Sequence, residues 1–312
     1  MGLAALLLAI LIGGGAQAGE PRRQRPAVAA ASASVVAVLP QWPAQKRRSE
    51  EPEGSGVAVL DGHYILTAAH VIADAQAIRI VSSDGQVMAA TLAARDEATD
   101  LALLRIDDQL PALSFGGDAE LGEEACILGN AFGLGLSVSC GTVSAVHRSG
   151  TGFNAIEDFV QTDAAANPGT SGGALVALDG TLLGIVSAIF TKQSDANIGV
   201  NFAVSAPLAG RVARALRDRG RVEWLAAGMR LEPAPAPGAL GPKGARVALV
   251  RDGSVAAAAG IEVDDLIVQA ARQRVSGPAD FVGALARFAP PATLAIILLR
   301  DGQKRQLMLE FK

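Results

Sequence analysis

Several features that mark other protein classes are missing from this chain. Its 312 residues include only three histidines and two cysteines, and aromatic side chains make up 4% of the total. No cluster of His, Cys or acidic residues has the spacing of metal ligands, and no glycine-rich nucleotide loop is present, so no metal or cofactor is expected. The formal net charge of −4 gives no reason to expect a nucleic acid partner.

A long hydrophobic run is also missing. The apolar run near the N-terminus covers only residues 3–12, whereas a helix needs about 20 residues to span a bilayer. Because the A-x-A sequence at residues 16–18 is typical of a cleavage site, we predict that residues 1–18 are a signal peptide and that the protein is periplasmic. No Lys or Arg precedes the run, and an uncleaved anchor is the alternative. Residues 19–28 are expected to form a mobile leader.

The most informative segment that the chain does contain is a serine among glycines. Gly169 lets the backbone turn, so that the N–H groups of Gly169 and Ser171 can point at one position and stabilise an oxyanion there. Gly172 and Gly173 would keep bulk away from a substrate backbone. Taken alone, a Gly-Ser cluster is more often a flexible loop.

A serine nucleophile needs a base and a carboxylate, and both have candidates upstream. His70 follows an apolar strand that ends in small residues, which leaves room for a substrate and for the serine. Asp100 directly precedes an apolar run, where a charge is costly unless it is paired. A lone His or Asp is more often structural, but the order His, Asp, Ser favours a catalytic triad. We predict that Ser171 attacks, His70 moves the proton and Asp100 orients His70.

At this point the chain resembles the HtrA/Deg (high-temperature-requirement) family of serine proteases. The segments that carry the resemblance are residues 54–56, 67–71, 99–104, 129–134, 163–173 and 198–204. The resemblance implies two antiparallel barrels of the chymotrypsin-like double β-barrel fold, with His70 and Asp100 from the first barrel and Ser171 from the second. It also implies assembly as a homo-oligomer, usually a trimer.

The chain departs from the family pattern at three positions. Ala68 stands where Asn is frequent, Ala131 replaces the usual Pro, and Thr170 replaces the usual Asn before the nucleophile. None of these changes removes a catalytic group, so they bear on loop geometry and specificity.

Substrate preference can also be predicted by resemblance. The family's S1 pocket would be lined here by three residues, namely Ala188, Ile189 and Phe190. They carry no charge, so we expect cleavage after small or medium aliphatic residues. A digestive trypsin-like enzyme is disfavoured, because it would typically carry an Asp six residues before the nucleophile, where this chain has Ala165, and several disulfides.

The pattern of the remaining sequence predicts short strands followed by a second domain. Asp-Gly pairs between apolar runs predict hairpins at residues 61–62, 84–85 and 179–180. Ser205 and Pro207 predict the start of a helix that ends at Gly220. We therefore expect a protease domain at residues 29–220 and a separate domain at residues 222–312.

The second unit resembles a small PDZ-like α/β domain of the HtrA type. Ser276, Pro278 and the apolar residues after them predict a capped helix. PDZ domains bind an extended C-terminal peptide by strand addition, and the residues for this would be Ala227, Gly228, Met229 and Leu231. The strand after the loop would contain Pro233, Pro235 and Pro237, which would weaken the peptide's hydrogen bonds.

The two cysteines leave two readings open. Cys126 and Cys140 flank the loop at residues 130–136, and they would be nearly opposite if the strands around that loop pair as a hairpin. Export makes a disulfide permissible. The alternative is a pair of buried free thiols.

The function expected from these features is ATP-independent cleavage of unfolded or misfolded proteins in the cell envelope. The alternative is a peptide-binding sensor or chaperone in which proteolysis is secondary. Unfolded protein or peptide is the expected partner in both cases.

Overall fold

The computed structural model describes residues 26–43, 54–189, 199–234 and 243–312, without the side chains of residues 188 and 189. The predicted signal peptide lies outside these residues, as does most of the predicted leader. Within them, no helix is long and apolar enough to cross a membrane.

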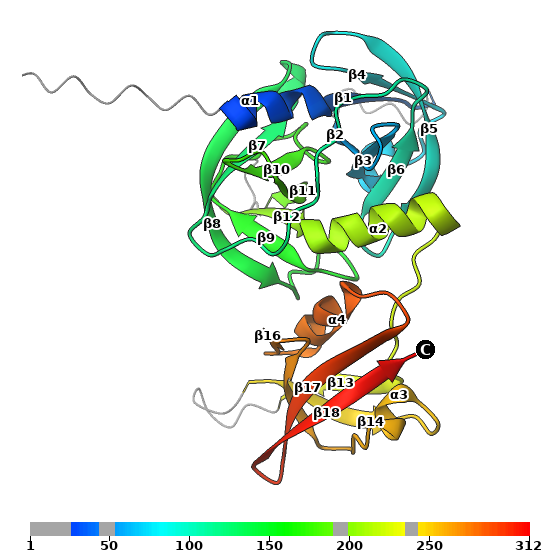
Figure 1. Cartoon of the computed structure of the whole chain (residues 1–312), viewed down its shortest axis with the longest axis vertical. Coiled ribbons are helices and arrows are strands. Elements are labelled where there is room, and N and C mark those ends of the chain that lie inside the picture. The colour runs from blue at the N-terminus through cyan, green and yellow to red at the C-terminus, as the bar shows by residue number, and fades with distance from the viewer. Residues whose placement is uncertain (1–25, 44–53, 190–198, 235–242) are drawn as a thin grey trace, which may run out of the picture.

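The first part of the chain forms two closed six-stranded barrels, as expected (Figure 1). The first barrel has the order β1 (Val35–Gln41), β2 (Gly54–Val59), β3 (Tyr64–Ala68), β6 (Leu101–Arg105), β5 (Val87–Asp96), β4 (Ala77–Val81). The second has the order β10 (Ala174–Ala177), β11 (Leu182–Ile189), β12 (Asn201–Ser205), β9 (Phe159–Thr162), β8 (Ser137–Arg148), β7 (Glu124–Gly129). The predicted double β-barrel is therefore confirmed.

Tight turns join consecutive strands where Asp-Gly pairs predicted them. Gly62, Gly85 and Gly180 have φ angles of 86°, 86° and 87°, which glycine adopts without steric cost. The flanking strands pair in antiparallel fashion in all three cases. These three hairpins are confirmed.

The last three residues of the predicted leader belong to a helix. Helix α1 (Pro26–Ala31) starts within the segment expected to be mobile. Val28 and Ala31 are each only 4% exposed and belong to the core cluster that joins the two barrels. Burial of these side chains explains why residues 26–28 are helical rather than part of a leader.

A helix packs on the barrels on the side that faces the C-terminal part of the chain. Helix α2 (Ala206–Arg219) begins at Ser205, whose side chain accepts a hydrogen bond from the Leu208 N–H. It ends at Gly220, whose φ of 68° is left-handed. Both predicted ends are confirmed, and Leu208, Val212 and Leu216 pack into the core between the barrels.

The C-terminal part has its own sheet and its own hydrophobic core. The sheet has the order β13 (Met229–Pro233), β14 (Ala245–Val250), β15 (Leu266–Ala270), β17 (Ala292–Arg300), β18 (Gln303–Phe311), with β16 (Gln273–Arg274) beside β15. Two helices accompany it, α3 (Val255–Ala258) and α4 (Pro278–Ala286). Helix α4 lies on the side of this sheet nearest the barrels and contacts β8 (Figure 1). We call residues 26–220 the barrel domain and residues 227–312 the C-terminal domain.

Two details of the C-terminal domain differ from the prediction. The N-cap of α4 is Gly277 and makes no side-chain hydrogen bond, so Ser276 is not the cap. Strand β13 ends at Pro233, while Pro235 and Pro237 lie outside the described residues. Because β13 pairs only with β14 in the described sheet, it is an edge strand.

The two cysteines form a disulfide. Cys126 on β7 lies directly opposite Cys140 on β8 in the strand register. The hairpin pairing that would make a disulfide possible is thus present, and the reading as free thiols is wrong.

Candidate active site

The imidazole of His70 is fixed by Asp100 at two points. Strand β3 ends at Ala68, and a 3₁₀ turn, η3 (Ala69–Ile72), carries His70. Its ring Nδ1 lies 2.6 Å from Asp100 Oδ2, and its backbone N–H donates to Asp100 Oδ1 at 2.9 Å. Their side chains are 52% and 17% exposed, so the imidazole is accessible while the carboxylate is shielded. This geometry fixes the ring orientation and leaves Nε2 available for a proton transfer.

The position of Asp100 depends on an uncommon backbone conformation. Its φ angle is 57°, in the left-handed region that Asp tolerates better than most residues. The Asp100 carbonyl accepts a hydrogen bond from the Ala69 N–H at 2.9 Å. Backbone and side chain of Asp100 thus bind the same turn, which orients the carboxylate toward His70.

Ser171 lies in the turn between β9 and β10, packed against the strands that lead to His70. Its carbonyl accepts a hydrogen bond from the Ser55 N–H on β2 at 2.8 Å. The next residue, Gly172, donates to the Val186 carbonyl at 2.7 Å. In the described part of the chain, Ser171 Oγ makes no hydrogen bond to His70. A candidate nucleophile and a candidate base therefore lie on neighbouring segments from different barrels.

The two glycines after Ser171 are needed for close packing of the turn, a role that was not predicted from the sequence. A Cβ on Gly172 would lie 2.1 Å from the Ser55 carbonyl and 2.4 Å from Thr67 Oγ1. A Cβ on Gly173 would lie 2.5 Å from the Leu128 carbonyl. These glycines allow the serine turn to pack directly on the barrel strands, so their small size is required by the fold of the turn.

Ser55 is a residue to which the sequence alone assigned no role. It is fully buried, and its Oγ donates to the Gly169 carbonyl at 2.7 Å while accepting from the Asn130 N–H at 2.8 Å. One hydroxyl thus joins the first barrel to the loop before Ser171 and to the loop after β7. The only sequence signal was the small-residue motif at residues 54–56.

The loop before Ser171 is held by further hydrogen bonds. Gly169 has a φ of 94°, as required for the predicted turn of the backbone. Thr170 Oγ1 donates to the Asn167 carbonyl at 2.7 Å and accepts from the Asn167 N–H at 3.2 Å. Thr170, which departs from the family pattern, therefore closes this turn with its own hydroxyl. The Phe132 N–H donates to the Pro168 carbonyl at 2.7 Å, which links the turn to the loop that contains Ala131.

The predicted S1 residues are only partly within the described structure. Ala188 and Ile189 lie on β11, opposite Phe202 and Asn201 of β12, while Phe190 lies outside the described residues. Of the residues before Ser171, Ala164 and Ala166 are fully buried. The Asn201 side chain donates to the Ala164 carbonyl at 2.8 Å, which fixes this segment against β12.

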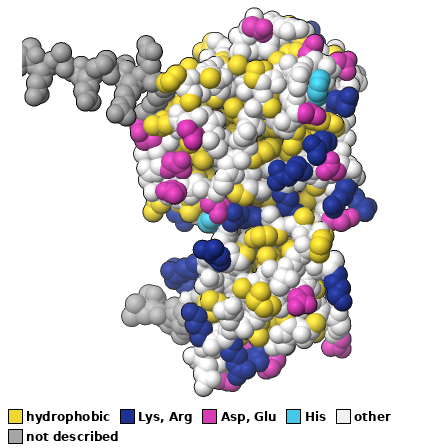
Figure 2. All heavy atoms as spheres, in the orientation of Figure 1, with side chains coloured by type: hydrophobic (Ala, Val, Ile, Leu, Met, Phe, Trp, Pro, Cys, Tyr) yellow, Lys and Arg dark blue, Asp and Glu magenta, His cyan; other side chains and the backbone are white. Residues whose placement is uncertain are grey.

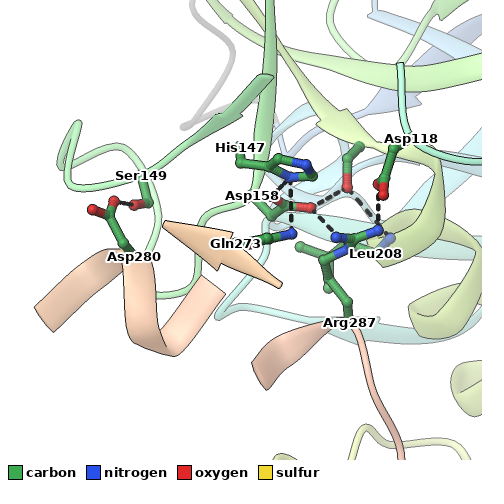
Figure 3. A network of polar contacts seen from close by, with 9 residues as sticks. Asp118, His147, Ser149, Asp158, Leu208, Gln273, Asp280 and Arg287 are labelled. Carbon is green, nitrogen blue, oxygen red and sulfur yellow. Dashed lines mark hydrogen bonds and ion pairs between the residues drawn. The ribbon is translucent and has the colours of Figure 1, made fainter. Parts of the chain in front are cut away.

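A second histidine–carboxylate pair lies away from this site, at the junction of the two domains (Figure 3). His147 Nδ1 lies 2.8 Å from Oδ1 of Asp158, which is 2% exposed. Ser205 Oγ donates to Asp158 Oδ2 at 2.5 Å. The serine thus contacts the carboxylate and not the imidazole. Gln273 of the C-terminal domain contacts His147 Nδ1 at 3.0 Å, so this pair joins the domains.

Arg211 of α2 also connects the domains. Its guanidinium lies over the Trp224 ring at 4.5 Å and donates to the carbonyls of Glu223 and Ala286. Burial lowers the pKa of Arg211 to about 10. Because its partners are carbonyls and an aromatic face, this cation depends on the segment that follows Gly220 for its hydrogen bonds.

The residues predicted to bind a C-terminal peptide lie together. Ala227, Gly228, Met229 and Leu231 line one groove of about 660 Å³ beside β13 and α4. The other lining residues are mostly apolar and include Phe281 and, from the barrel domain, Ile156, while Arg230 and Arg251 are charged. Within the described residues, no group of three or more His, Cys, Asp or Glu side chains is placed to hold a metal ion.

Comparison with known proteins shows which proteins this chain is similar to. The family model of the trypsin-like peptidase domain matches residues 54–185. A probable periplasmic serine endoprotease DegP-like from Halomonas elongata is 34% identical over 86% of this chain and 58% of its own length. Its counterpart from Chlamydia pneumoniae is 36% identical over 85% of this chain and 56% of its own. This chain thus spans little more than half the length of these relatives.

Solved structures match over nearly their whole length. The HtrA-type protease AlgW, solved with a tripeptide, has a TM-score of 0.71 and 36% identity, covering 92% of this chain and 96% of its own. The serine endoprotease from Yersinia pestis has a TM-score of 0.61 and 32% identity, covering 94% of this chain and 99% of its own.

Proposed function

This chain belongs to the HtrA-type, DegP-like family of trypsin-like serine endoproteases, and from that membership we propose that it is an ATP-independent endopeptidase of the cell envelope. Its substrates would be unfolded or misfolded proteins. The proposal rests on the two hydrogen bonds between Asp100 and His70, one to the imidazole ring and one from the backbone N–H. The strand that leads to His70 packs against the Ser171 turn.

The reaction follows from the residues at this site. Ser171 Oγ attacks the scissile carbonyl while His70 Nε2 accepts its proton. The N–H groups of Gly169 and Ser171 stabilise the oxyanion. His70 then returns the proton to the leaving amine, which breaks the peptide bond, and water hydrolyses the acyl-enzyme in the same way. Asp100 stabilises the imidazolium in both steps.

Labelling and turnover test these roles together. Ser171→Ala should abolish casein cleavage and labelling by a fluorophosphonate, and His70→Ala should lower turnover by about 10⁴- to 10⁶-fold. His147→Ala is the matched control, because it removes a histidine that also contacts a carboxylate but does not belong to the proposed triad. Substantial turnover by Ser171→Ala, or equal losses in His147→Ala and His70→Ala, would reject the assignment.

Envelope localisation and assembly are parts of the same proposal. The relatives are named periplasmic, and the A-x-A sequence at residues 16–18 supports export through a cleaved signal peptide. Trimer assembly is proposed from the family resemblance. N-terminal sequencing of the mature protein and sedimentation measurements test these two points.

The apolar groove favours a second candidate function, that of a peptide-binding sensor or chaperone. Edge strand β13 could accept an extended peptide whose carboxylate meets the loop at Ala227 and Gly228. AlgW was solved with a tripeptide, in keeping with peptide binding in this family. Comparing suppression of aggregation by wild type and by Ser171→Ala separates the two functions, because a chaperone would keep that activity without the nucleophile.

A further inference from the structure

A second and larger cleft lies between the two domains. Its volume is about 1180 Å³, and it is lined on one side by residues 146–150 at the end of β8. The other side consists mainly of the β15–β16 turn, β16 and the start of α4, and it also includes Lys243, Arg287 and Phe288. Pro278 is the one lining residue that it shares with the apolar groove. The residues proposed for catalysis do not line it. It is therefore a separate site.

This cleft carries a surplus of positive charge in an acidic protein. Five Lys or Arg side chains line it against two Asp side chains, although the whole chain has a net charge of −4. Four of the cations are exposed and form no ion pair within the described residues, namely Arg148, Lys243, Arg272 and Arg274. Figure 2 shows Lys and Arg side chains around the junction of the domains.

The acidic side chains of the cleft are already engaged. Asp118 pairs with Arg287, the fifth cation. Asp280 accepts hydrogen bonds from the Ser149 hydroxyl and from the Ser276 N–H. Neither acid pairs with the four exposed cations, so their charge is available to a ligand.

We propose that this cleft binds an acidic stretch of polypeptide, in a protein substrate or a protein partner. Arginine forks suit carboxylates, and the cations come from both domains, as an extended chain would require. The apolar residues Val146, Pro278 and Phe288 would contact the side chains between the carboxylates.

Other anions fit less well. Asp280 already lies in the first turn of α4, so the positive end of that helix is compensated and offers little to a phosphate. Among the described residues, only two aromatic rings, His147 and Phe288, line the cleft, and the His147 ring already contacts Asp158, so it offers few stacking platforms for nucleic acid bases.

The test uses full-length Ser171→Ala protein, so that cleavage plays no part and the outcome is independent of the proposed catalysis. The probe is a fluorescent peptide of alternating Glu and Ala with an amidated C-terminus, which the carboxylate-binding loop of the apolar groove should not capture. We expect saturable binding at low salt with a Kd on the order of 10–100 μM. Binding should weaken strongly as salt rises.

Two pairs of substitutions locate the binding. Arg272 has a φ of 71°, so Arg272→Gly removes a charge and relieves backbone strain. Combined with Arg274→Ser, it should weaken binding about three- to thirtyfold without lowering Tm. Lys304→Ser with Arg305→Ser removes the same charge from exposed positions on β18 and should leave Kd nearly unchanged.

Three results would overturn the proposal. One is absence of saturable binding up to about 1 mM peptide. Another is equal weakening by both pairs, which would indicate general charge attraction. The third is much tighter binding of polyphosphate or of vesicles of anionic lipid, lost in the Arg272→Gly/Arg274→Ser protein, which would assign the cleft to another ligand class.

Discussion

Ser55→Ala tests whether one buried hydroxyl positions the oxyanion loop. The substitution removes the donor to the Gly169 carbonyl and the acceptor for the Asn130 N–H. Ser55, whose hydroxyl binds both backbone groups, is fully buried. Leaving a buried polar group without a hydrogen-bond partner costs about 1–3 kcal/mol. For two such groups the expected loss of stability is about 2–6 kcal/mol, or a fall in Tm of about 4–24 °C for a domain of this size.

The catalytic effect should appear in kcat rather than in KM. Ser55 would act on the reaction through Gly169, whose N–H is proposed to stabilise the oxyanion. Direct loss of an oxyanion donor costs about 10²- to 10³-fold in kcat, so an indirect displacement should cost about 10- to 100-fold. Labelling by a fluorophosphonate should slow in parallel, because that reaction also develops charge on an oxygen in the oxyanion site.

The matched control is Ser205→Ala. Ser205 is also buried, and its hydroxyl also bridges two groups, the Asp158 carboxylate and the Leu208 N–H. Loss of this helix cap should cost about 1–2 kcal/mol but should leave kcat unchanged. Both variants are assayed with an ester substrate, well below their Tm values. If Ser55→Ala keeps kcat within about twofold of wild type, or if Ser205→Ala loses as much activity, the positioning argument is wrong.

Three further predictions concern specificity, the disulfide and the domain boundary. A peptide-library profile should be dominated by Ala, Val or Leu at P1, because the predicted S1 residues carry no charge; a profile dominated by Lys or Arg would contradict it. Replacing Cys126 and Cys140 by Ala and Ser should lower stability by about 3 kcal/mol in denaturant titrations, as expected for a loop of about 15 residues; an unchanged midpoint would contradict it. A chain ending at residue 220 should fold and hydrolyse small esters, but its Tm should be lower than that of a chain ending at residue 226. Only the longer chain retains the contacts of Arg211 with Glu223 and Trp224, so equal Tm values would contradict this prediction.

Local chemistry explains which features could be predicted from the sequence. Asp-Gly pairs specify turns with positive φ, and a Ser at one end with a Gly at the other specifies the limits of α2. These signals act over a few residues, so no knowledge of the tertiary fold is needed. The barrels followed from many such turns together with the family resemblance.

Features that depend on distant segments could not be predicted in the same way. Ser55 meets Gly169 across 114 positions of sequence, and the obstacles to a Cβ on Gly172 come from β2 and β3. The disulfide required the register of β7 against β8, which spacing alone left open. A residue such as Ser55 looks unremarkable in sequence because its importance arises only when two barrels bring their loops together.

The choice between the two histidine–aspartate pairs shows why a catalytic assignment needs the fold as well as the pair. His70–Asp100 and His147–Asp158 have similar nitrogen–oxygen distances, 2.6 and 2.8 Å, so the pair geometry alone does not separate them. What differs is the surroundings of each imidazole. His70 is half exposed and follows a strand against which the Ser171 turn packs. His147 is mostly covered, and its Nδ1 also contacts Gln273 of the other domain. The same pairing can therefore orient a base at one place and join two domains at another.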